Sequence, residues 1–182
     1  MKTTTERLAE EILRIGFQCT RCALCGRSVS KDSNLVLVEP REVRVIMEAT
    51  GLPWEEIAEP YPEFMEAENG CQYTFAWCMR REGDHCRFAD GNRCTIYPHR
   101  PLICRTYPFM LGEEGELIVS ECPGIGTEIP PEEARAIAQD LIMRKTEEDM
   151  EFEEISGIYA EAHLPPGGVV VIDSEGVKSV HE

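Results

Sequence analysis

Positive charge is scarce in this sequence. Its 182 residues include 18 lysines and arginines against 34 aspartates and glutamates, which gives a formal net charge of −16. A nucleic-acid-binding protein needs a basic face to neutralise phosphates, and docking on an anionic membrane also requires basic residues. We therefore expect neither nucleic acid nor a membrane among the partners. An acidic surface suits a protein partner that carries a basic patch.

Long hydrophobic runs are also missing. Charged side chains interrupt the N-terminal segment MKTTTERLAEEILRIGF, so it lacks the apolar core of a signal peptide. The longest apolar stretch elsewhere, around residues 167–172, is far too short to span a bilayer. We therefore expect a cytoplasmic protein, in which thiols stay reduced.

Familiar catalytic patterns do not occur either. No glycine-rich loop follows a strand in a way that would cradle a nucleotide or S-adenosylmethionine, and no serine, histidine and carboxylate spacing suggests hydrolysis. The C-x3-C-x2-C spacing of radical S-adenosylmethionine enzymes is absent. The sequence leaves open whether the protein is an enzyme, and it identifies no substrate, pathway or oligomeric state.

The spacing of apolar residues predicts a small single domain over residues 1–182, of the α+β class, with short strands and irregular cysteine-rich loops organised around metal. The expected helices are one capped by Thr3 and Glu6 and ending at Gly16, one over 40–50, a short one from Pro53, and a long one over 130–155. The expected strands lie over 35–38, in the segment CQYTFAWCM, over 117–119, and over 168–173 before a turn at 174–176.

Cysteine, in contrast, is abundant, with nine residues. The odd count argues against a fully paired set of disulfides. Cys19, Cys22 and Cys25 form a C-x2-C-x2-C run just after the first helix, and two-residue spacers let thiolates converge on one centre. Cys71 and Cys78 flank an aromatic strand, where a place in the core is an equally good alternative. The remaining cysteines lie in irregular segments: Cys86, Cys94, Cys104 and Cys122.

The segments CTRCALCGR, CRFADGNRCTIYPHRPLICRTYPF and CPGIG resemble the YkgJ-type cysteine-cluster family, which is described as a zinc- or iron-chelating domain. The resemblance covers about residues 17–126, and we expect the helix over 130–155 and the strand over 168–173 to pack onto this region. It implies ligand roles for seven residues: Cys19, Cys22, Cys25, Cys86, Cys94, Cys104 and Cys122. The family's first motif usually ends in a doubled cysteine, and this chain has Gly26 there. Either one site lacks a thiolate, or Cys71 or Cys78 replaces it.

Two four-thiolate sites would need eight ligands. In bacterial ferredoxins a C-x2-C-x2-C run is completed by a remote cysteine that precedes proline, and Cys122 precedes Pro123 here. We therefore assign one site to Cys19, Cys22, Cys25 and Cys122, and a second site to Cys78, Cys86, Cys94 and Cys104. We favour a [4Fe–4S] cluster over Zn²⁺, although zinc would accept the same sulfurs. Whether there are one or two sites stays open.

Arginines and aromatic residues surround the later cysteines. We expect Arg100 and Arg105 to donate hydrogen bonds to thiolates, with an ordinary ion pair to an acid as the alternative. Tyr107, with Tyr97 and Phe109, is expected to close the site against water. His85 and His99 fit surface positions better than ligand positions.

Together these features predict a metal-binding protein with an iron–sulfur cluster and a redox or metal-handling role. One alternative is a structural zinc-binding interaction module. Another is a metal-dependent enzyme resembling a protein lysine methylase, because flagellin lysine N-methylases carry a related cysteine cluster.

Overall fold

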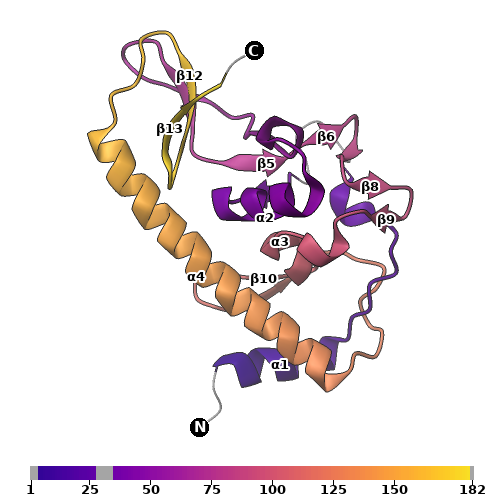
Figure 1. Cartoon of the computed structure of the whole chain (residues 1–182). Coiled ribbons are helices and arrows are strands. Elements are labelled where there is room, and N and C mark those ends of the chain that lie inside the picture. The colour runs from indigo at the N-terminus through magenta and orange to yellow at the C-terminus, as the bar shows by residue number, and fades with distance from the viewer. Residues whose placement is uncertain (1–3, 28–34, 181–182) are drawn as a thin grey trace. The chain divides into compact units, whose positions relative to one another are not determined.

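The computed structural model describes residues 4–27 and 35–180 (Figure 1). The chain forms two compact units. The first, here called the cysteine-loop unit, contains the chain up to Cys25 together with Ala89–Glu147. The second, the sheet unit, contains Gly26–Phe88 and Glu148–Glu182. The long helix α4 (Pro131–Glu161) contributes its first part to one unit and its second part to the other.

The cysteine-loop unit combines helices with short hairpins. Its helices are α1 (Thr4–Ile15), α3 (Leu102–Thr106) and the first part of α4. Strand β10 (Phe109–Leu111) pairs antiparallel with β11 (Leu117–Val119), and β8 (Ala89–Asp90) pairs antiparallel with β9 (Arg93–Cys94). A 3₁₀ turn, η3 (Tyr97–His99), leads into α3.

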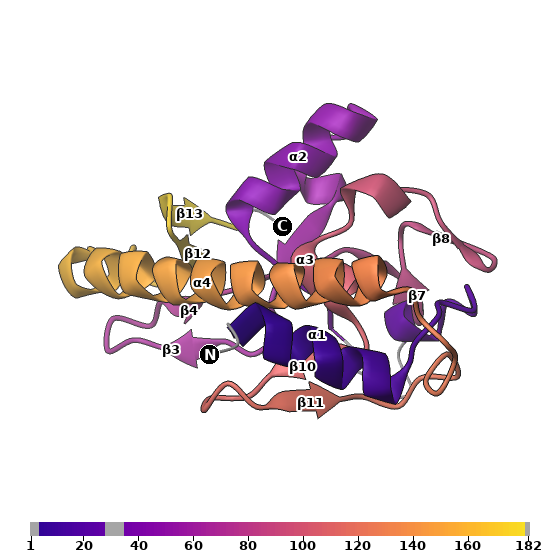
Figure 2. The same ribbon diagram turned by 90° about the horizontal axis from the view of Figure 1, so that it is seen from below.

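One hydrophobic core holds this unit together. Leu8 and Ile12 on α1 lie one turn apart and pack with Phe109, Ala138 and Leu141. Because Ala138 is small, α1 can lie close alongside α4, and Figure 2 shows the two helices side by side. This core fixes the end of α1, and therefore the start of the cysteine run that follows it.

The sheet unit contains two larger sheets and a helix. Strands β1 (Leu37–Val38), β5 (Trp77–Met79) and β2 (Ala58–Pro60) form an antiparallel sheet in the order β1-β5-β2. The second sheet has the order β13-β12-β4-β3, from β3 (Met65–Glu66), β4 (Gln72–Thr74), β12 (Val169–Asp173) and β13 (Gly176–Ser179). Strand β12 runs parallel to β4, and its other neighbour β13 is antiparallel. Smaller elements are α2 (Pro40–Thr50), the turn η2 (Trp54–Glu56), and the hairpin of β6 (Arg81–Glu82) with β7 (His85–Cys86).

A buried polar pair links the two sheets of this unit. The indole Nε1 of Trp77 donates a 2.7 Å hydrogen bond to Asp173 Oδ2, and Asp173 is only 1% exposed. The ammonium of Lys178 lies 2.8 Å from the same oxygen. A buried carboxylate is tolerated here because it has both a donor and a cation.

The predicted α+β class is confirmed, and several elements agree closely with the sequence expectation. Helix α2 has the expected bounds, and Gly51 ends it with a left-handed φ of 72°. Strand β11 lies over the expected 117–119, and β12 is followed by the expected turn. The capping residue Thr3 lies outside the described residues. The domain boundaries stay a prediction.

Three expectations need correction. The segment CQYTFAWCM does not form one strand: it contributes β4 and β5, which belong to different sheets. The short helix expected from Pro53 is only the 3₁₀ turn η2. Helix α4 continues to Glu161 rather than ending near 155, because Ile155 and Ile158 pack against the core around Cys71 and Val170.

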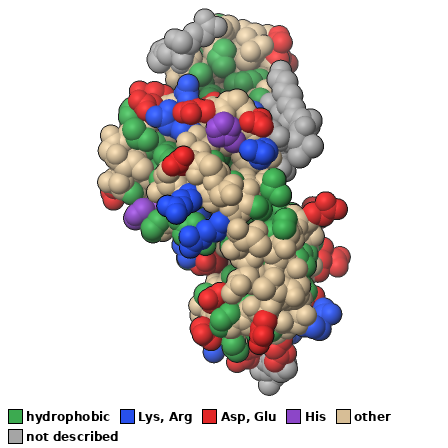
Figure 3. Space-filling view, turned by 90° about the vertical axis from the view of Figure 1, so that its right-hand side faces the viewer, with side chains coloured by type: hydrophobic (Ala, Val, Ile, Leu, Met, Phe, Trp, Pro, Cys, Tyr) green, Lys and Arg blue, Asp and Glu red, His purple; other side chains and the backbone are tan. Residues whose placement is uncertain are grey.

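No helix in the described part of the chain combines the length and the apolar character that a membrane span requires. Charged side chains of both signs are interspersed on the face drawn in Figure 3.

Candidate metal centre

The cysteine run begins where α1 ends. Gly16 takes a φ of 74° and its N–H donates to Ile12 O at 2.8 Å, which terminates the helix. A Cβ at this position would lie only 2.5 Å from Thr127 O, so a side chain would collide with neighbouring backbone. Glycine is therefore required for the approach of the two chain segments.

After α1 the chain pairs with the segment that carries the last cysteine. Phe17 and Ile125 form an antiparallel bridge, in which Gln18 N–H donates to Gly124 O at 3.0 Å. A Cβ at Gly124 would lie 2.1 Å from Gln18 O, so only glycine allows this pairing. The bridge fixes Cys19 and Cys122 on adjoining segments, although they are about a hundred residues apart in sequence.

The loop that contains the three cysteines has an unusual backbone. Arg21 and Ala23 both take left-handed conformations, with φ values of 55° and 58°, and the turn η1 (Leu24–Gly26) follows. Non-glycine residues in this region cost free energy, and such strain concentrates at functional sites. The two positions lie in the two spacers of the C-x2-C-x2-C run.

The loop stabilises the ionised form of Cys22. The backbone N–H of Leu24 and the Thr20 hydroxyl donate hydrogen bonds to its sulfur, and together they lower the pKa of this thiol despite partial desolvation. Hydrogen bonds of this kind favour the thiolate, which is the form that binds a metal.

Cys25 shows the opposite behaviour. Although the residue as a whole is exposed, burial of its thiol raises the pKa, and the nearby charges of Cys19 and Cys22 raise it further. The three thiols are therefore close enough to interact electrostatically. Three thiolates in one loop repel each other unless a cation is bound among them.

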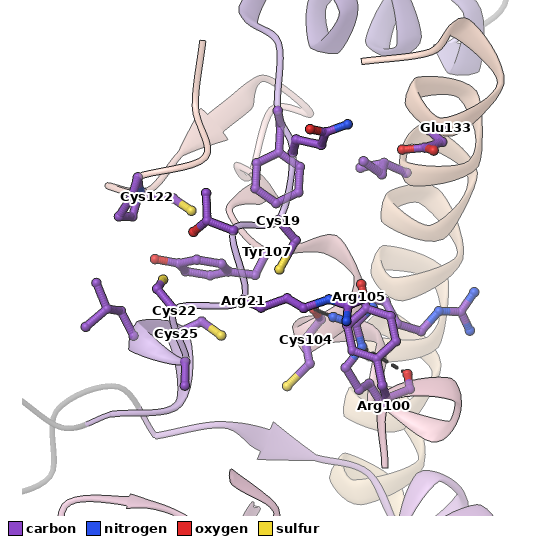
Figure 4. A pocket seen from close by; sticks show the side chains of 18 of the residues that line it. Cys19, Arg21, Cys22, Cys25, Arg100, Cys104, Arg105, Tyr107, Cys122 and Glu133 are labelled. Atoms are coloured by element: carbon purple, nitrogen blue, oxygen red, sulfur yellow. Dashed lines mark hydrogen bonds between the residues drawn. The ribbon is translucent and has the colours of Figure 1, made fainter. Parts of the chain in front are cut away.

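Five cysteines line one cavity of about 450 Å³ within the cysteine-loop unit. They come from three parts of the chain: Cys19, Cys22, Cys25, Cys104 and Cys122. In Figure 4 their sulfurs point toward a common space, with the phenol of Tyr107 among them. Apolar side chains, including Phe17 and Ile137, form part of the wall.

Tyr107 has the predicted position beside the thiols. Its hydroxyl donates a 2.7 Å hydrogen bond to Glu121 O, which orients the ring. Desolvation raises the pKa of the phenol, and the charges of Cys122, Cys25 and Cys22 raise it further. The phenol therefore stays neutral beside the thiols.

Arg100 also lines the cavity, but its hydrogen bonds go to backbone carbonyls, and the predicted donation to thiolates stays a prediction. Its Nε donates to Tyr97 O at 3.1 Å and its Nη1 to Cys104 O at 3.3 Å, while the guanidinium stacks 3.6 Å from the centre of the Tyr97 ring. Its charge acts to lower the pKa of both Cys25 and Cys94. Arg100 thus faces two thiols from different parts of the sequence.

Arg105 lines the same cavity but has a different partner. Its Nη2 and Nε donate to the two carboxylate oxygens of Asp140 on α4, at 2.7 and 3.1 Å. This is the ordinary ion pair that the sequence left as the alternative to thiolate binding. The bidentate geometry occupies much of the guanidinium fork.

Three predicted ligands lie outside the cavity lining, namely Cys94, Cys86 and Cys78. Cys94 ends the β8–β9 hairpin, where desolvation raises the pKa of its thiol, while the Ile96 N–H and the charge of Arg100 act to lower it. Cys86 belongs to the sheet unit and lies beside Gly26, because a Cβ on Gly26 would be 3.3 Å from the Cβ of Cys86. The family's missing cysteine would therefore have been a neighbour of Cys86.

Cys71 and Cys78 are buried in the sheet unit. Cys78 is 1% exposed in β5, and its sulfur donates to Glu59 O at 3.5 Å and Pro60 O at 3.8 Å. Cys71 is fully buried against Val170 and Ile172. The structure therefore favours the core alternative for both, and we do not retain Cys78 as a ligand.

Within residues 4–27 and 35–180, no three histidine, cysteine, aspartate or glutamate side chains already form a group that could hold a metal ion. The cavity gathers thiols without presenting a completed coordination shell. The cavity lining also includes Thr20 and Arg21, which lie between cysteines in the sequence. That position was the signal for them.

Residues 18–123 match the CxxCxxCC family, whose description is "Putative zinc- or iron-chelating domain". The matched segment covers more than half of the chain and includes all nine cysteines. No curated protein and no solved structure matches the chain.

Proposed function

Because the chain belongs to the CxxCxxCC family of zinc- or iron-chelating domains, we propose that its thiol-lined cavity holds a [4Fe–4S] cluster with a redox or metal-handling role. The observation that carries the proposal is the gathering of five cysteines from three parts of the chain around one cavity. A cytoplasmic location would keep these thiols reduced and able to bind metal.

Cys19, Cys22 and Cys25 would provide three of the thiolates. Their spacing and the hydrogen bonds to Cys22 suit a metal centre better than a set of unrelated thiols. Cys122, which the Phe17–Ile125 bridge holds near Cys19, is the proposed fourth ligand. Cys104 lines the same cavity, so we assign it here rather than to a separate site. Ligand roles for Cys86 and Cys94 stay predictions.

The size of the cavity supports a cluster over a single ion. Its volume of about 450 Å³ leaves room for a centre larger than a single ion. A cluster supplies one-electron transfer when it is bound. The chain's own residues would hold it, exclude water through Tyr107 and Phe17, and balance its charge through arginine.

Zinc is the second candidate because the Leu24 N–H to Cys22 sulfur hydrogen bond would serve a zinc-thiolate site equally well. A zinc site would make the protein a structural interaction module. In either case the acidic chain, with its net charge of −16, suits a partner with a basic surface.

Purification without oxygen tests the choice of metal. We expect brown protein with broad visible absorbance that bleaches in air, and iron and acid-labile sulfide in nearly equal amounts. Colourless protein with stoichiometric zinc would reject the cluster and support the zinc alternative. Protein that takes up neither metal after anaerobic reconstitution would reject the proposed function itself.

Serine substitutions test the ligand set. Cys22→Ser and Cys122→Ser should each abolish the same metal centre, because each removes a proposed ligand. Cys71→Ser is the matched control, since this thiol lies in the core of the sheet unit. Metal content retained in Cys122→Ser but lost in Cys104→Ser would transfer the fourth ligand position to Cys104.

A further inference from the structure

Arg21 lines the cavity, and within the described parts of the chain it has no hydrogen-bonded or ion-pair partner. Arg105 is paired with Asp140, and Arg100 contacts two backbone carbonyls and a tyrosine ring. No ion pair or hydrogen bond from Arg21 to a side chain in the described ranges is present, although acids outnumber bases by 34 to 18 in the chain. In Figure 4 its side chain extends from the cysteine loop into the cavity.

The backbone at Arg21 makes this placement notable. Its φ of 55° lies in the left-handed region, which glycine or asparagine would adopt at lower cost. Arg21 lies in the spacer between Cys19 and Cys22, and in Figure 4 its side chain runs through the cavity toward the side where Arg105 is labelled. The structure therefore accepts local strain while placing a cation in the cavity that the thiols line.

The negative charge of the proposed metal centre explains why an arginine would lie in the cavity. Four thiolates around Zn²⁺ or around a 2+ cluster leave a net charge of about −2, which is costly to hold away from water without compensating cations. Arg100 provides one cation that already acts on Cys25 and Cys94. A second is needed, and the Asp140 carboxylate largely neutralises Arg105.

One carboxylate, Glu133, is among the residues that line the cavity. It lies in the first turn of α4, where the positive end of the helix dipole stabilises a negative charge. Glu133 therefore does not need Arg21 as a counter-ion. The guanidinium remains available to the thiolates.

We propose that Arg21, together with Arg100, neutralises the metal-thiolate centre, and that Arg105 instead serves the stability of the fold. This inference rests on the proposed function, because it requires thiolates bound to a metal. It replaces Arg105, which the sequence predicted as a donor to thiolates, with Arg21. Arg21 acts through its charge and is not itself a ligand.

The test uses Co²⁺ and Zn²⁺ as probes of the full-length protein under anaerobic conditions. Cobalt in a thiolate site gives visible charge-transfer and ligand-field bands, so the spectrum reports the ligand set independently of affinity. Competition with a chelator then gives zinc affinity. Wild-type protein that shows neither these bands nor iron–sulfur absorbance after anaerobic reconstitution would reject the proposed function, whereas bands in wild-type protein allow the arginine variants to be compared.

Arg21→Gln should keep the cobalt spectrum but weaken zinc affinity by about ten- to a hundred-fold, the usual effect of losing a residue that supports a metal ligand. Arg21→Lys should restore most of the affinity because it keeps the charge. The difference between Arg21→Gln and wild type should shrink at about 1 M salt, where the screening length falls to about 3 Å. A purely structural role would not respond to salt in this way.

Two control variants separate charge from folding. Ala23→Gly relaxes the second left-handed position of the same loop without changing charge, so its effect on affinity should not depend on salt. Arg105→Gln should lower the unfolding temperature through loss of the Asp140 pair while keeping zinc affinity. Wild-type affinity in Arg21→Gln at low salt, or an equal loss in Arg21→Gln and Arg105→Gln, would overturn the inference.

Discussion

Phe109 is the residue whose truncation should most damage the cysteine-loop unit. Its side chain is 0% exposed and belongs to the core that joins α1 to α4. Its ring meets the edge of Phe17 at a centroid distance of 5.8 Å and an angle of 88°. Because Phe17 also lines the thiol cavity, Phe109 supports the wall of the candidate metal centre from behind.

The expected cost of Phe109→Ala follows from this burial. Removing a fully buried phenylalanine side chain costs about 3–5 kcal/mol, which combines lost transfer free energy with the cavity left behind. Of this, the edge-to-face contact with Phe17 contributes about 0.5–1.5 kcal/mol. The total is a large part of the roughly 5–15 kcal/mol by which a typical domain is stable.

Urea unfolding of the reduced, metal-free protein, followed by far-ultraviolet circular dichroism, measures the change. Phe152→Ala is a matched control, because the same atoms are removed from a side chain that is 73% exposed on α4. The control should change the free energy of unfolding by less than about 0.5 kcal/mol. If Phe109→Ala cost no more than Phe152→Ala, the assignment of Phe109 to a closely packed core would be refuted.

Three further predictions concern the sheet unit. Burial raises the pKa of Glu39 to about 7 from its ordinary value near 4.5, so folding stability should fall as pH rises between these values. Urea unfolding across that range should show that the free energy of unfolding depends less on pH in Glu39→Gln than in wild type. An equal pH dependence in the two proteins would contradict this. Trp77→Phe should cost about 1–3 kcal/mol because it removes the donor to buried Asp173, and a thermal melt measures the loss. Gly26→Cys should form a disulfide with Cys86 in air, because the two Cβ atoms need to move apart by only a few tenths of an ångström. Mass spectrometry should then detect two fewer free thiols than in the reduced variant. An unchanged number of free thiols would contradict the close approach of residues 26 and 86.

Local signals in the sequence predicted those elements that depend on local physics. Helix α2 carries its own start and stop in Pro40 and Gly51, so its bounds could be predicted directly. The division of CQYTFAWCM could not, because β4 pairs with β12 and β5 pairs with β1 and β2, and these partners are distant in the chain. Strand pairing of this kind is decided by tertiary contacts rather than by propensity.

The candidate site also has features that local spacing predicts and features that depend on tertiary packing. The two-residue spacers predicted that Cys19, Cys22 and Cys25 converge, and the Cys122-Pro123 step identified a remote partner. The presence of Cys104 in the same cavity depends on how α3 packs, which spacing does not encode. The partner of Arg105 likewise depended on which acid of α4 came within reach, namely Asp140.

The parallel pairing of β4 with β12 also has a consequence for how the protein is made. Val170 covers Cys71 in the finished core but follows it by about a hundred residues, so the ribosome releases it later. At a synthesis rate of roughly 5–20 residues per second, the thiol of Cys71 stays uncovered for about 5–20 s before Val170 is made. By the end of that interval every cysteine of the chain has been synthesised, and the nascent protein exposes more thiols than the folded one. Cells short of reductant would therefore damage newly synthesised chains before mature ones.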